Sequence, residues 1–461
     1  MRLVRKLTRG AGLFALLLVP AAASAHAFGQ QYTLPLPLSL YMVGAGAALV
    51  ASFAILGLFS HPGGHTRTYV KEDSISESLS RGISLVLRIL GMLIFFFALG
   101  TAFFGSVEAG ENPSLFLFWI GLLLMVTYAS AIVAGLWKRL DPFRALARLV
   151  LGKHYEPLFV FPEWLRYVPA LTVYLSILWL ELLSFGAGSI PHNIGYTLLG
   201  YLALTLFGVG LFGYKQWFRY GDFFSVFFGV VERFAPFQLN NRALTIAPPG
   251  ERSLERADSL VFLVFILLML SSTAFDAVRE TQMWFDILSA HTLVLQNFEL
   301  VSTMVLIVSP LAFLALYAAA ISLMCVITKI PSRFSEMLLR FAFSLIPIVV
   351  AYNFAHYFTL ILMEGQNFIP MLSDPLAQGW NLFGTADYVF DPGIIDAGVV
   401  WYTQVGAILV GHIVATYIAH RIALREFASR AHIILGQIPM LVLMIFYTGF
   451  GLWILSLPFS L

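Results

Sequence analysis

The chain has 461 residues, of which 59% are hydrophobic and only 11% carry a charge, and its mean hydropathy is +0.85. Soluble globular domains carry charge at about a quarter of their positions, so this composition excludes an ordinary soluble protein and indicates one that folds in a lipid bilayer. The net charge of +2 gives no strong basic field for nucleic acid. The single cysteine, Cys325, excludes an intrachain disulfide and a cysteine-rich metal site.

The first residues are typical of a secretory signal peptide. A basic start precedes a short apolar run, and Ala23, Ser24 and Ala25 then form the small-x-small pattern that signal peptidase accepts. We predict a signal peptide over residues 1–25, whose removal leaves His26 as the mature N-terminus on the far side of the membrane. An uncleaved anchor is the alternative.

Ten apolar runs follow, each long enough to cross about 30 Å of hydrocarbon as a helix. They predict an all-α transmembrane bundle that forms one domain over residues 26–461. The runs cover residues 36–59, 82–104, 115–137, 168–188, 195–214, 259–279, 300–328, 337–363, 399–424 and 435–458.

The loop charges predict how this bundle is oriented. With the mature N-terminus outside, the inner connections 138–167 and 215–258 each carry six Lys or Arg residues. The positive-inside rule therefore favours a bacterial inner membrane protein with both termini in the periplasm. The outer connections are residues 105–114, 189–194, 280–299 and 364–398, and they contain no Lys or Arg.

Two connections are too long or too apolar to be simple tethers. Residues 220–237 mix phenylalanines with Asp222, Glu232 and Arg233, and we expect this segment to lie along the inner membrane interface. Residues 364–398 are rich in Pro, Gly and Asp, and we expect them to fold into an outer cap, because long structureless loops are uncommon in compact domains.

Ionisable side chains inside the spans are the first functional candidates. A charge at the bilayer centre costs at least about 2.5–3.5 kcal/mol, so each one retained there needs a partner or a function. Asp276 and Glu280 lie four residues apart on one helical face of the sixth span and could share a cation or a proton. Arg279 could neutralise one of them, so a salt bridge at the helix end is the alternative. Glu181, in the fourth span, is a further candidate.

His356 provides a second candidate group in the eighth span. It shares a helical face with Tyr352 and Asn353, and Glu364 lies two turns further out. An imidazole, an amide and a carboxylate could therefore point into one cavity. A simple hydrogen bond from His356 to a neighbouring helix is the alternative.

Other histidines suggest metal binding or proton transfer. His412, Thr416 and His420 stand four residues apart in the ninth span, a stripe that could bind a metal, ligate haem or relay protons. His420 precedes Arg421, and we expect it to end the helix at the inner surface. If the signal peptide is removed, the amine and imidazole of His26 form a chelating pair suited to Cu(II).

The motifs that the chain lacks narrow its chemistry. It has no Walker-type phosphate loop, no His-Glu-x-x-His zinc helix and no Gly-x-Ser-x-Gly nucleophile elbow. ATP-driven transport and serine-hydrolase chemistry are therefore disfavoured. A metal-assisted or carboxylate–histidine site reached from the periplasm remains.

Several stretches resemble bacterial multi-span membrane proteins known as fenitrothion hydrolases. They are HAFGQQYTLPLPLSLYMVGAGAAL at the mature start, LLMLSSTAFDAVRETQMW around Asp276, NFAHYFTLILMEGQNFIPMLSDPLAQGWNLFGTADY around His356, GHIVATYIAHRIAL and the closing QIPMLVLMIFYTGFGLWILSLP. The resemblance implies a membrane-bound organophosphorus hydrolase that cleaves the phosphorus–O-aryl bond of a thiophosphate triester and releases a nitrophenol. It brings no established catalytic motif and assigns no residue a role.

A divalent metal ion would give this hydrolysis a chemical route, because it lowers the pKa of its bound water and polarises the phosphoryl group. We predict Asp276, Glu280 and His356 as catalytic residues. The predicted metal ligands are His26, His356, Asp276, Glu280, Glu181 and His412.

Two other functions use the same residues. The first is a protein that binds or transports a metal ion of the copper type at the inner membrane. A transporter needs a continuous polar path through His356, His412 and His420. The second is a structural partner in a larger membrane complex, in which these groups only hold helices together. A hydrolase needs only an outward pocket for a small hydrophobic substrate.

Overall fold

The computed structural model describes residues 36–59, 71–74, 76–240 and 243–457. The predicted signal peptide 1–25 and His26 lie outside these residues. The predicted all-α bundle and its ten spans are confirmed, and they fit a multi-pass membrane protein. The helical spans in the described residues are Leu38–Leu58, Glu77–Phe104, Pro113–Ile132, Glu163–Leu182, Pro191–Val231, Leu260–Arg279, Phe298–Ile327, Ala342–Ser373, Ala397–Glu426 and Arg430–Leu455.

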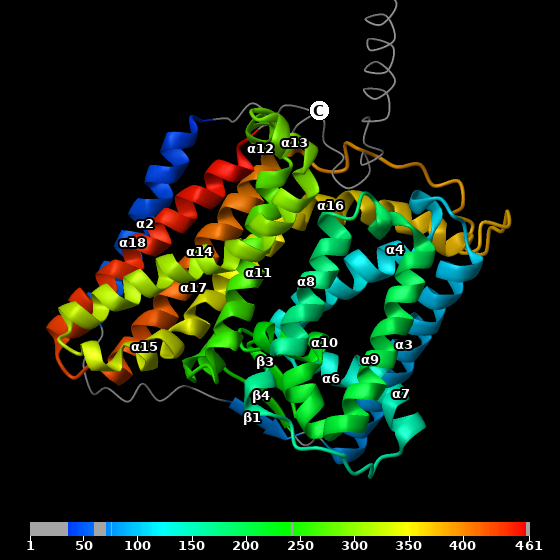
Figure 1. Cartoon of the computed structure of the whole chain (residues 1–461), viewed down its shortest axis with the longest axis horizontal. Coiled ribbons are helices and arrows are strands. Elements are labelled where there is room, and N and C mark those ends of the chain that lie inside the picture. The colour runs from blue at the N-terminus through cyan, green and yellow to red at the C-terminus, as the bar shows by residue number, and fades with distance from the viewer. Residues whose placement is uncertain (1–35, 60–70, 75, 241–242, 458–461) are drawn as a thin grey trace, which may run out of the picture.

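The connections between spans gather at two ends of the bundle (Figure 1). One end, which we call the basic end, carries the Lys and Arg residues of segments 133–162, 232–259 and 328–341. The opposite end, which we call the acidic end, includes α12 (Gln282–Ser289) and α13 (Thr292–Gln296). The connections at this end are residues 105–112, 183–190, 280–297 and 374–396, and they contain no Lys or Arg.

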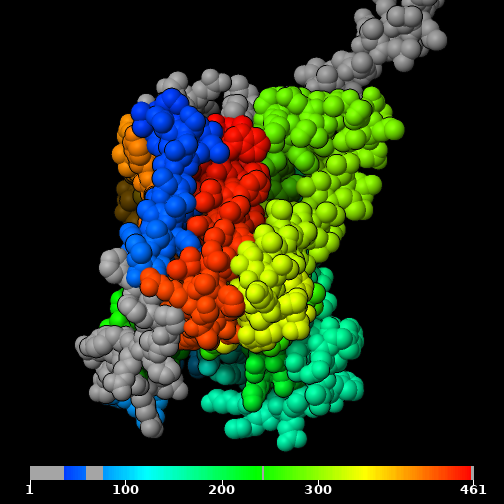
Figure 2. All heavy atoms as spheres, turned by 90° about the vertical axis from the view of Figure 1, so that its left-hand side faces the viewer, coloured from blue at the N-terminus to red at the C-terminus, as the bar shows by residue number. Residues whose placement is uncertain are grey.

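The spans form two groups of helices. The first group lies at the left of Figure 1, and Figure 2 shows its edge, where α2 and α18 lie side by side. It consists of α2 (Leu38–Phe59), α14 (Phe298–Ile327), α17 (Ala397–Glu426) and α18 (Arg430–Leu455), with the short α15 (Phe334–Arg340) at the basic end. The second group consists of α3 (Glu77–Phe104), α4 (Pro113–Leu115), the π-helical segment Phe116–Met125, α5 (Val126–Ile132), α8 (Val168–Leu182), α9 (Pro191–Gln216) and α10 (Phe223–Val231).

Two helices join the groups. α11 (Leu260–Arg279) packs against α14 of the first group and α8 of the second, and α16 (Ile346–Ser373) packs against α17 and the π-helical segment. α11 and α16 also contact each other. Fifteen of the twenty residues of α11 are buried, as expected of a helix that is apolar on every side.

A small sheet at the basic end was not predicted from the sequence. Its strand order is β1-β4-β3-β2, with β4 antiparallel to both neighbours and β2 parallel to β3. α6 (Leu136–Leu140) lies next to it, since Arg139 donates to the Leu239 carbonyl of β3 at 2.6 Å, and α7 (Pro142–Leu151) follows α6 in the chain. The strands are β1 (Lys71–Ser74), β2 (Val133–Ala134), β3 (Phe237–Leu239) and β4 (Ala243–Ile246).

The segment 220–237 differs from the predicted interfacial segment. Its central helix, α10, has Phe223, Phe224 and Phe228 buried, and the remaining positions are at least half-buried. The physical reason is that α10 is apolar on all sides, and such a helix is stable inside the protein. Asp222 accepts a hydrogen bond from the Ser225 amide and caps its first turn.

The predicted cap begins later than residue 364, because α16 continues to Ser373. The cap therefore comprises residues 374–396, which form turns without a helix or strand. Gln366 at the end of α16 holds it, since the Gln366 amide donates to the Asp391 carbonyl at 3.0 Å and accepts from the Tyr388 hydroxyl at 3.2 Å.

Candidate functional site

A buried carboxylate on α11 meets two side chains of α16. Asp276 Oδ2 lies 2.9 Å from His356 Nε2 and accepts a hydrogen bond from the Tyr357 hydroxyl, also at 2.9 Å. Asp276 is 2% exposed, and His356 and Tyr357 are each 8% exposed. An ionised carboxylate only accepts hydrogen bonds, so His356 carries its proton on Nε2 when Asp276 is charged. We call Asp276, Arg279, Glu280, His356 and Tyr357 the Asp276 cluster.

Arg279 links the two acids predicted to converge. Its Nη2 atom lies 3.5 Å from Asp276 Oδ1 and 3.6 Å from Glu280 Oε1. The helical spacing therefore brings Asp276 and Glu280 to one place, and the cation within reach of both carboxylates is the Arg279 guanidinium. The cluster holds two carboxylates against one permanent cation, so a proton on His356 brings its formal charge to zero.

The described residues do not fit a divalent metal at this position. They contain no group of three or more His, Cys, Asp or Glu side chains that could hold an ion. Both oxygens of Asp276 already face donors, namely His356 and Tyr357 on one side and Arg279 on the other. A guanidinium at 3.5 Å repels a second cation from the same carboxylate.

Only some of the α16 residues predicted to share one cavity with His356 lie near it in the structure. Tyr352 is buried one turn before His356, and the charge of Asp276 acts on the Tyr352 hydroxyl. That hydroxyl has no hydrogen-bond partner among the residues that the structure describes. Asn353 points elsewhere and accepts from the Tyr128 hydroxyl at 2.9 Å. Glu364 accepts from the side chain of its neighbour Asn367 at 3.0 Å and lies outside the cluster.

Glu181 borders the cluster. It lies in the last turn of α8, and its charge acts on the hydroxyls of both Tyr174 and Tyr357. Tyr174 also contacts Ser272 at 3.2 Å between the two hydroxyl oxygens, one turn before Asp276 on α11. Glu181 is exposed, and its charge reaches the cluster through Tyr357.

His412 and His420 form a separate polar stripe between α17 and α18. His412 Nδ1 lies 2.9 Å from the Ile408 carbonyl, and His420 Nδ1 lies 3.1 Å from the Gln437 amide nitrogen. The prediction that His420 ends the helix is wrong, because α17 continues to Glu426 and His420 is 1% exposed. The apolar residues after His420, such as Ile422, extend the buried face by another turn.

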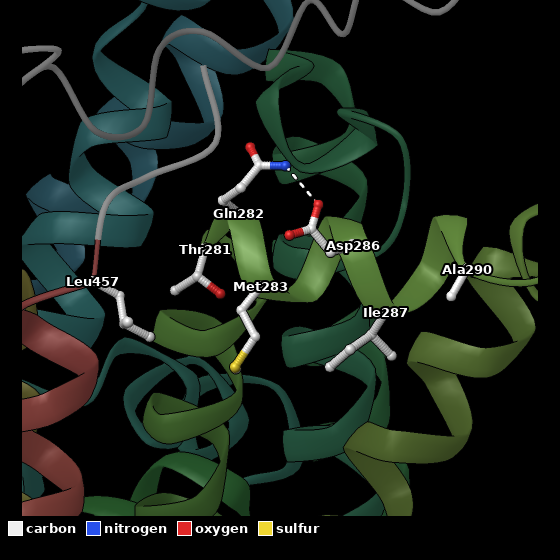
Figure 3. A pocket seen from close by; sticks show the side chains of 7 residues that line it. All are labelled: Thr281, Gln282, Met283, Asp286, Ile287, Ala290 and Leu457. Atoms are coloured by element: carbon white, nitrogen blue, oxygen red, sulfur yellow. Dashed lines mark hydrogen bonds between the residues drawn. The ribbon is translucent and has the colours of Figure 1, made fainter.

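Two hollows flank the cluster. The first has a volume of about 490 Å³ and lies at the acidic end, directly after Glu280 in the chain. Figure 3 shows its lining, in which the Gln282 amide donates to Asp286 at 2.9 Å beside Met283 and Ile287. The second, about 360 Å³, lies between α8 and α9 and includes Leu180, the neighbour of Glu181. The side chains of Asp276 and His356 line neither hollow.

Sequence reasoning missed Tyr357. Adjacent residues of a helix point about 100° apart, so a search for residues that share one face links His356 to Tyr352 and passes over Tyr357. In the structure His356 and Tyr357 both contact Asp276 Oδ2 at 2.9 Å. The usable signal was the His-Tyr pair itself, two polar side chains at successive positions inside a span.

No protein-family model matches the chain, and no match was found among curated proteins or among solved structures. The resemblance to fenitrothion hydrolases therefore stays a prediction from the sequence.

Proposed function

We propose that the chain is a membrane-embedded hydrolase of neutral phosphotriesters, in which Asp276 and His356 together act as the general base. The 2.9 Å contact between His356 Nε2 and Asp276 Oδ2, buried where two helix groups join, is the observation that supports this best. A neutral triester partitions into the bilayer and can reach a site between helices from the lipid. The loop charges favour a bacterial inner membrane with the acidic end toward the periplasm.

The proposed reaction is hydrolysis of a phosphorus–O-aryl bond. Water attacks phosphorus, and its proton passes to the Asp276–His356 pair, as in catalytic sites where a carboxylate stabilises an imidazolium. The phosphorus–oxygen bond to the aryl group breaks, and the aryloxide leaves and later takes up the proton. Arg279 lies beside Asp276 and supplies positive charge for the thiophosphoryl group as it becomes negative. This route uses side chains of the described residues and needs no metal ion.

The test is nitrophenol release from fenitrothion by detergent-purified protein. We expect turnover by the native chain, and a loss of about 10²–10⁴-fold in Asp276→Asn and in His356→Gln, the usual contribution of a general base. Glu364→Gln is the matched control, because Glu364 lies on the same helix and accepts from Asn367 outside the cluster. We expect it to keep full activity.

Three outcomes would count against the proposal. Folded native protein that releases no nitrophenol contradicts a hydrolase. Full activity in Asp276→Asn contradicts the assigned base. A rate that falls on chelation and returns with a divalent ion would instead support the metal-assisted route predicted from the sequence.

Metal-ion handling is a second candidate, and the stripe on α17 favours it. His412 is 2% exposed, and its Nε2 atom has no hydrogen-bond partner in the described part of the chain. Met444 lies beside the stripe, with its sulfur accepting from Thr416 Oγ1 at 3.2 Å. Imidazole and thioether are the donors that Cu(I) prefers. Copper bound stoichiometrically to purified protein, lost in His412→Ala and kept in the exposed-histidine control His291→Ala, would support it.

A further inference from the structure

Three arginines lie near the basic end of the second group, where α3 crosses α6 and α7. A Cβ atom at Gly91 would overlap the Leu140 carbonyl, so the α3 backbone lies directly against the end of α6. One turn further along, the rings of Phe95 and Phe143 make an edge contact with centroids 5.3 Å apart. Arg88 precedes Gly91 by three residues on α3, and α7 carries Arg144 and Arg148.

The exposed arginines lack an acidic partner. Arg88 and Arg148 are exposed, and neither forms a salt bridge with a carboxylate in the residues that the structure covers. Arg148 is exposed over much of its surface but partly desolvated by the protein around it, and this desolvation, followed by the charges of Arg144 and Arg88, lowers the pKa of Arg148 from its usual value. Asp141 is the nearby carboxylate, and its Oδ2 is already paired with Arg144 Nε at 3.2 Å. Two neighbouring cations are therefore left facing outward.

The length of α3 argues that Arg88 lies within the hydrocarbon. α3 has 28 residues, so it is about 42 Å long against a hydrocarbon thickness of about 30 Å. About twenty residues counted back from Phe104 reach residue 85, which places Arg88 roughly one turn inside the hydrocarbon boundary. Its neighbours Leu85, Val86 and Ile89 are exposed and face lipid. An arginine there must reach a phosphate or another anion at the interface to avoid a large desolvation penalty.

Arg148 belongs to a helix suited to the membrane interface. α7 buries Phe143 and Leu146 against the bundle, whereas Leu149 and Val150 beside Arg148 are 78% and 64% exposed. The following connection exposes more large apolar side chains, as an interfacial anchor does. These are Leu158, Phe159, Val160 and Trp164.

We propose that Arg88 and Arg148 bind the phosphate of an anionic phospholipid in the leaflet at the basic end. A phosphate between the two guanidinium groups offsets their mutual repulsion and accepts several charge-assisted hydrogen bonds. The acyl chains lie along the exposed apolar side chains of α3, including Leu85 and Ile89. A lipid with a net negative head group fits better than a zwitterionic one, because an ammonium group would face two arginines.

The test measures the thermal unfolding midpoint of the full chain in a neutral detergent. Phosphatidylglycerol, phosphatidylcholine and inorganic phosphate are added separately at equal concentration. We expect phosphatidylglycerol to raise the midpoint of the native chain clearly more than the other two, because a ligand that binds the folded state stabilises it. The combined Arg88→Gln and Arg148→Gln protein should lose this difference, and Arg88→Lys with Arg148→Lys should keep most of it.

Arg81→Gln is the matched control. Arg81 lies on the same helix with its side chain 76% exposed, and it pairs with Glu77 at 3.4 Å. We expect it to respond to phosphatidylglycerol like the native chain. An equal midpoint shift in the native chain and the double glutamine variant would overturn the proposal.

Two other results would also overturn it. Equal stabilisation by inorganic phosphate would show an ion site, and equal stabilisation by phosphatidylcholine would show a general detergent effect. If the double glutamine variant does not fold, Arg88→Gln and Arg148→Gln are purified separately from membranes that contain phosphatidylglycerol. The phosphatidylglycerol retained per protein is then measured for each. Phosphatidylglycerol retention equal to that of Arg81→Gln in both single variants would contradict the site.

Discussion

Asp276 is the side chain around which the candidate site is organised. A buried carboxylate is costly unless hydrogen bonds and opposite charge compensate it. Tyr357 and His356 face its Oδ2 atom, and Arg279 faces its Oδ1 atom. The neutral donor, Tyr357, can be removed without changing the formal charge of the site, so it separates the role of hydrogen bonding from that of charge.

Tyr357→Phe is expected to reduce turnover about two- to twelvefold if hydrolysis proceeds as proposed, because one hydrogen bond of about 0.5–1.5 kcal/mol that positions Asp276 is lost. Tyr128→Phe is the control. Tyr128 also bonds to α16, donating to Asn353 Oδ1 at 2.9 Å, but away from Asp276. Both variants should lose similar stability, and only Tyr357→Phe should lose activity. Equal rates in the two would show that Tyr357 is a packing residue.

At the scale of elements, close backbone contacts between helices decide how the second group packs. α3 reaches α6 through Gly91, where no side chain fits between the helix and the Leu140 carbonyl. Elsewhere on α3 the glycines are unconstrained, since a Cβ at Gly100 would meet nothing within 4 Å. The same helix therefore carries one glycine needed for packing and one that is not.

Gly91→Ala is expected to destabilise the folded chain by about 1–3 kcal/mol, the usual effect of overpacking a helix contact. Gly100→Ala should be neutral or stabilise by up to about 1 kcal/mol, because alanine favours the helix and no contact opposes it. Unfolding of the native chain and of the two variants in mixed micelles measures both changes in stability. Similar stability for the two variants would mean that α3 and α6 separate readily.

The elements show what the sequence can and cannot predict. Hydropathy and loop charge predicted all ten spans, because each run is long enough to form a complete helix on its own. The sheet escaped prediction because β2 has two residues and pairs with β3 about a hundred positions later. The contact of Asp276 with His356 was predicted only as a candidate, since helix packing, not spacing within either span, brings α11 against α16.

On the scale of the whole molecule, two helix groups meet along α11 and α16. At the basic end, the connection that precedes α11 pairs with the first group, since Glu251 lies 3.2 Å from Arg421 of α17. Asp141 caps α7, and Asp222 caps α10. Arg144 bridges the two caps by bonding to Asp141 and to Ser225. We expect the buried network of Asp141, Arg144 and Asp222 to make the stability of the chain depend on pH.

Burial, with the nearby charge of Asp222 adding to it, raises the pKa of Asp141 from 3.8 to about 7. Because the folded chain binds this proton more tightly than the unfolded chain, the stabilisation is complete below about pH 4 and is lost as the pH rises through about 7.

Asp141→Asn should therefore flatten the fall in stability between pH 4 and pH 7, because the amide cannot titrate and still caps α7 by accepting from the Arg144 amide. Unfolding midpoints measured across this range for the native chain, Asp141→Asn and the exposed-carboxylate control Glu163→Gln provide the comparison. The control should keep the native slope, since the Glu163 side chain is 86% exposed and lies outside the Asp141 network. If the stability of Asp141→Asn fell with pH as steeply as that of the native chain, the titrating proton would belong to another group. Asp141 and Asp222 would then stabilise α7 and α10 through hydrogen bonding alone.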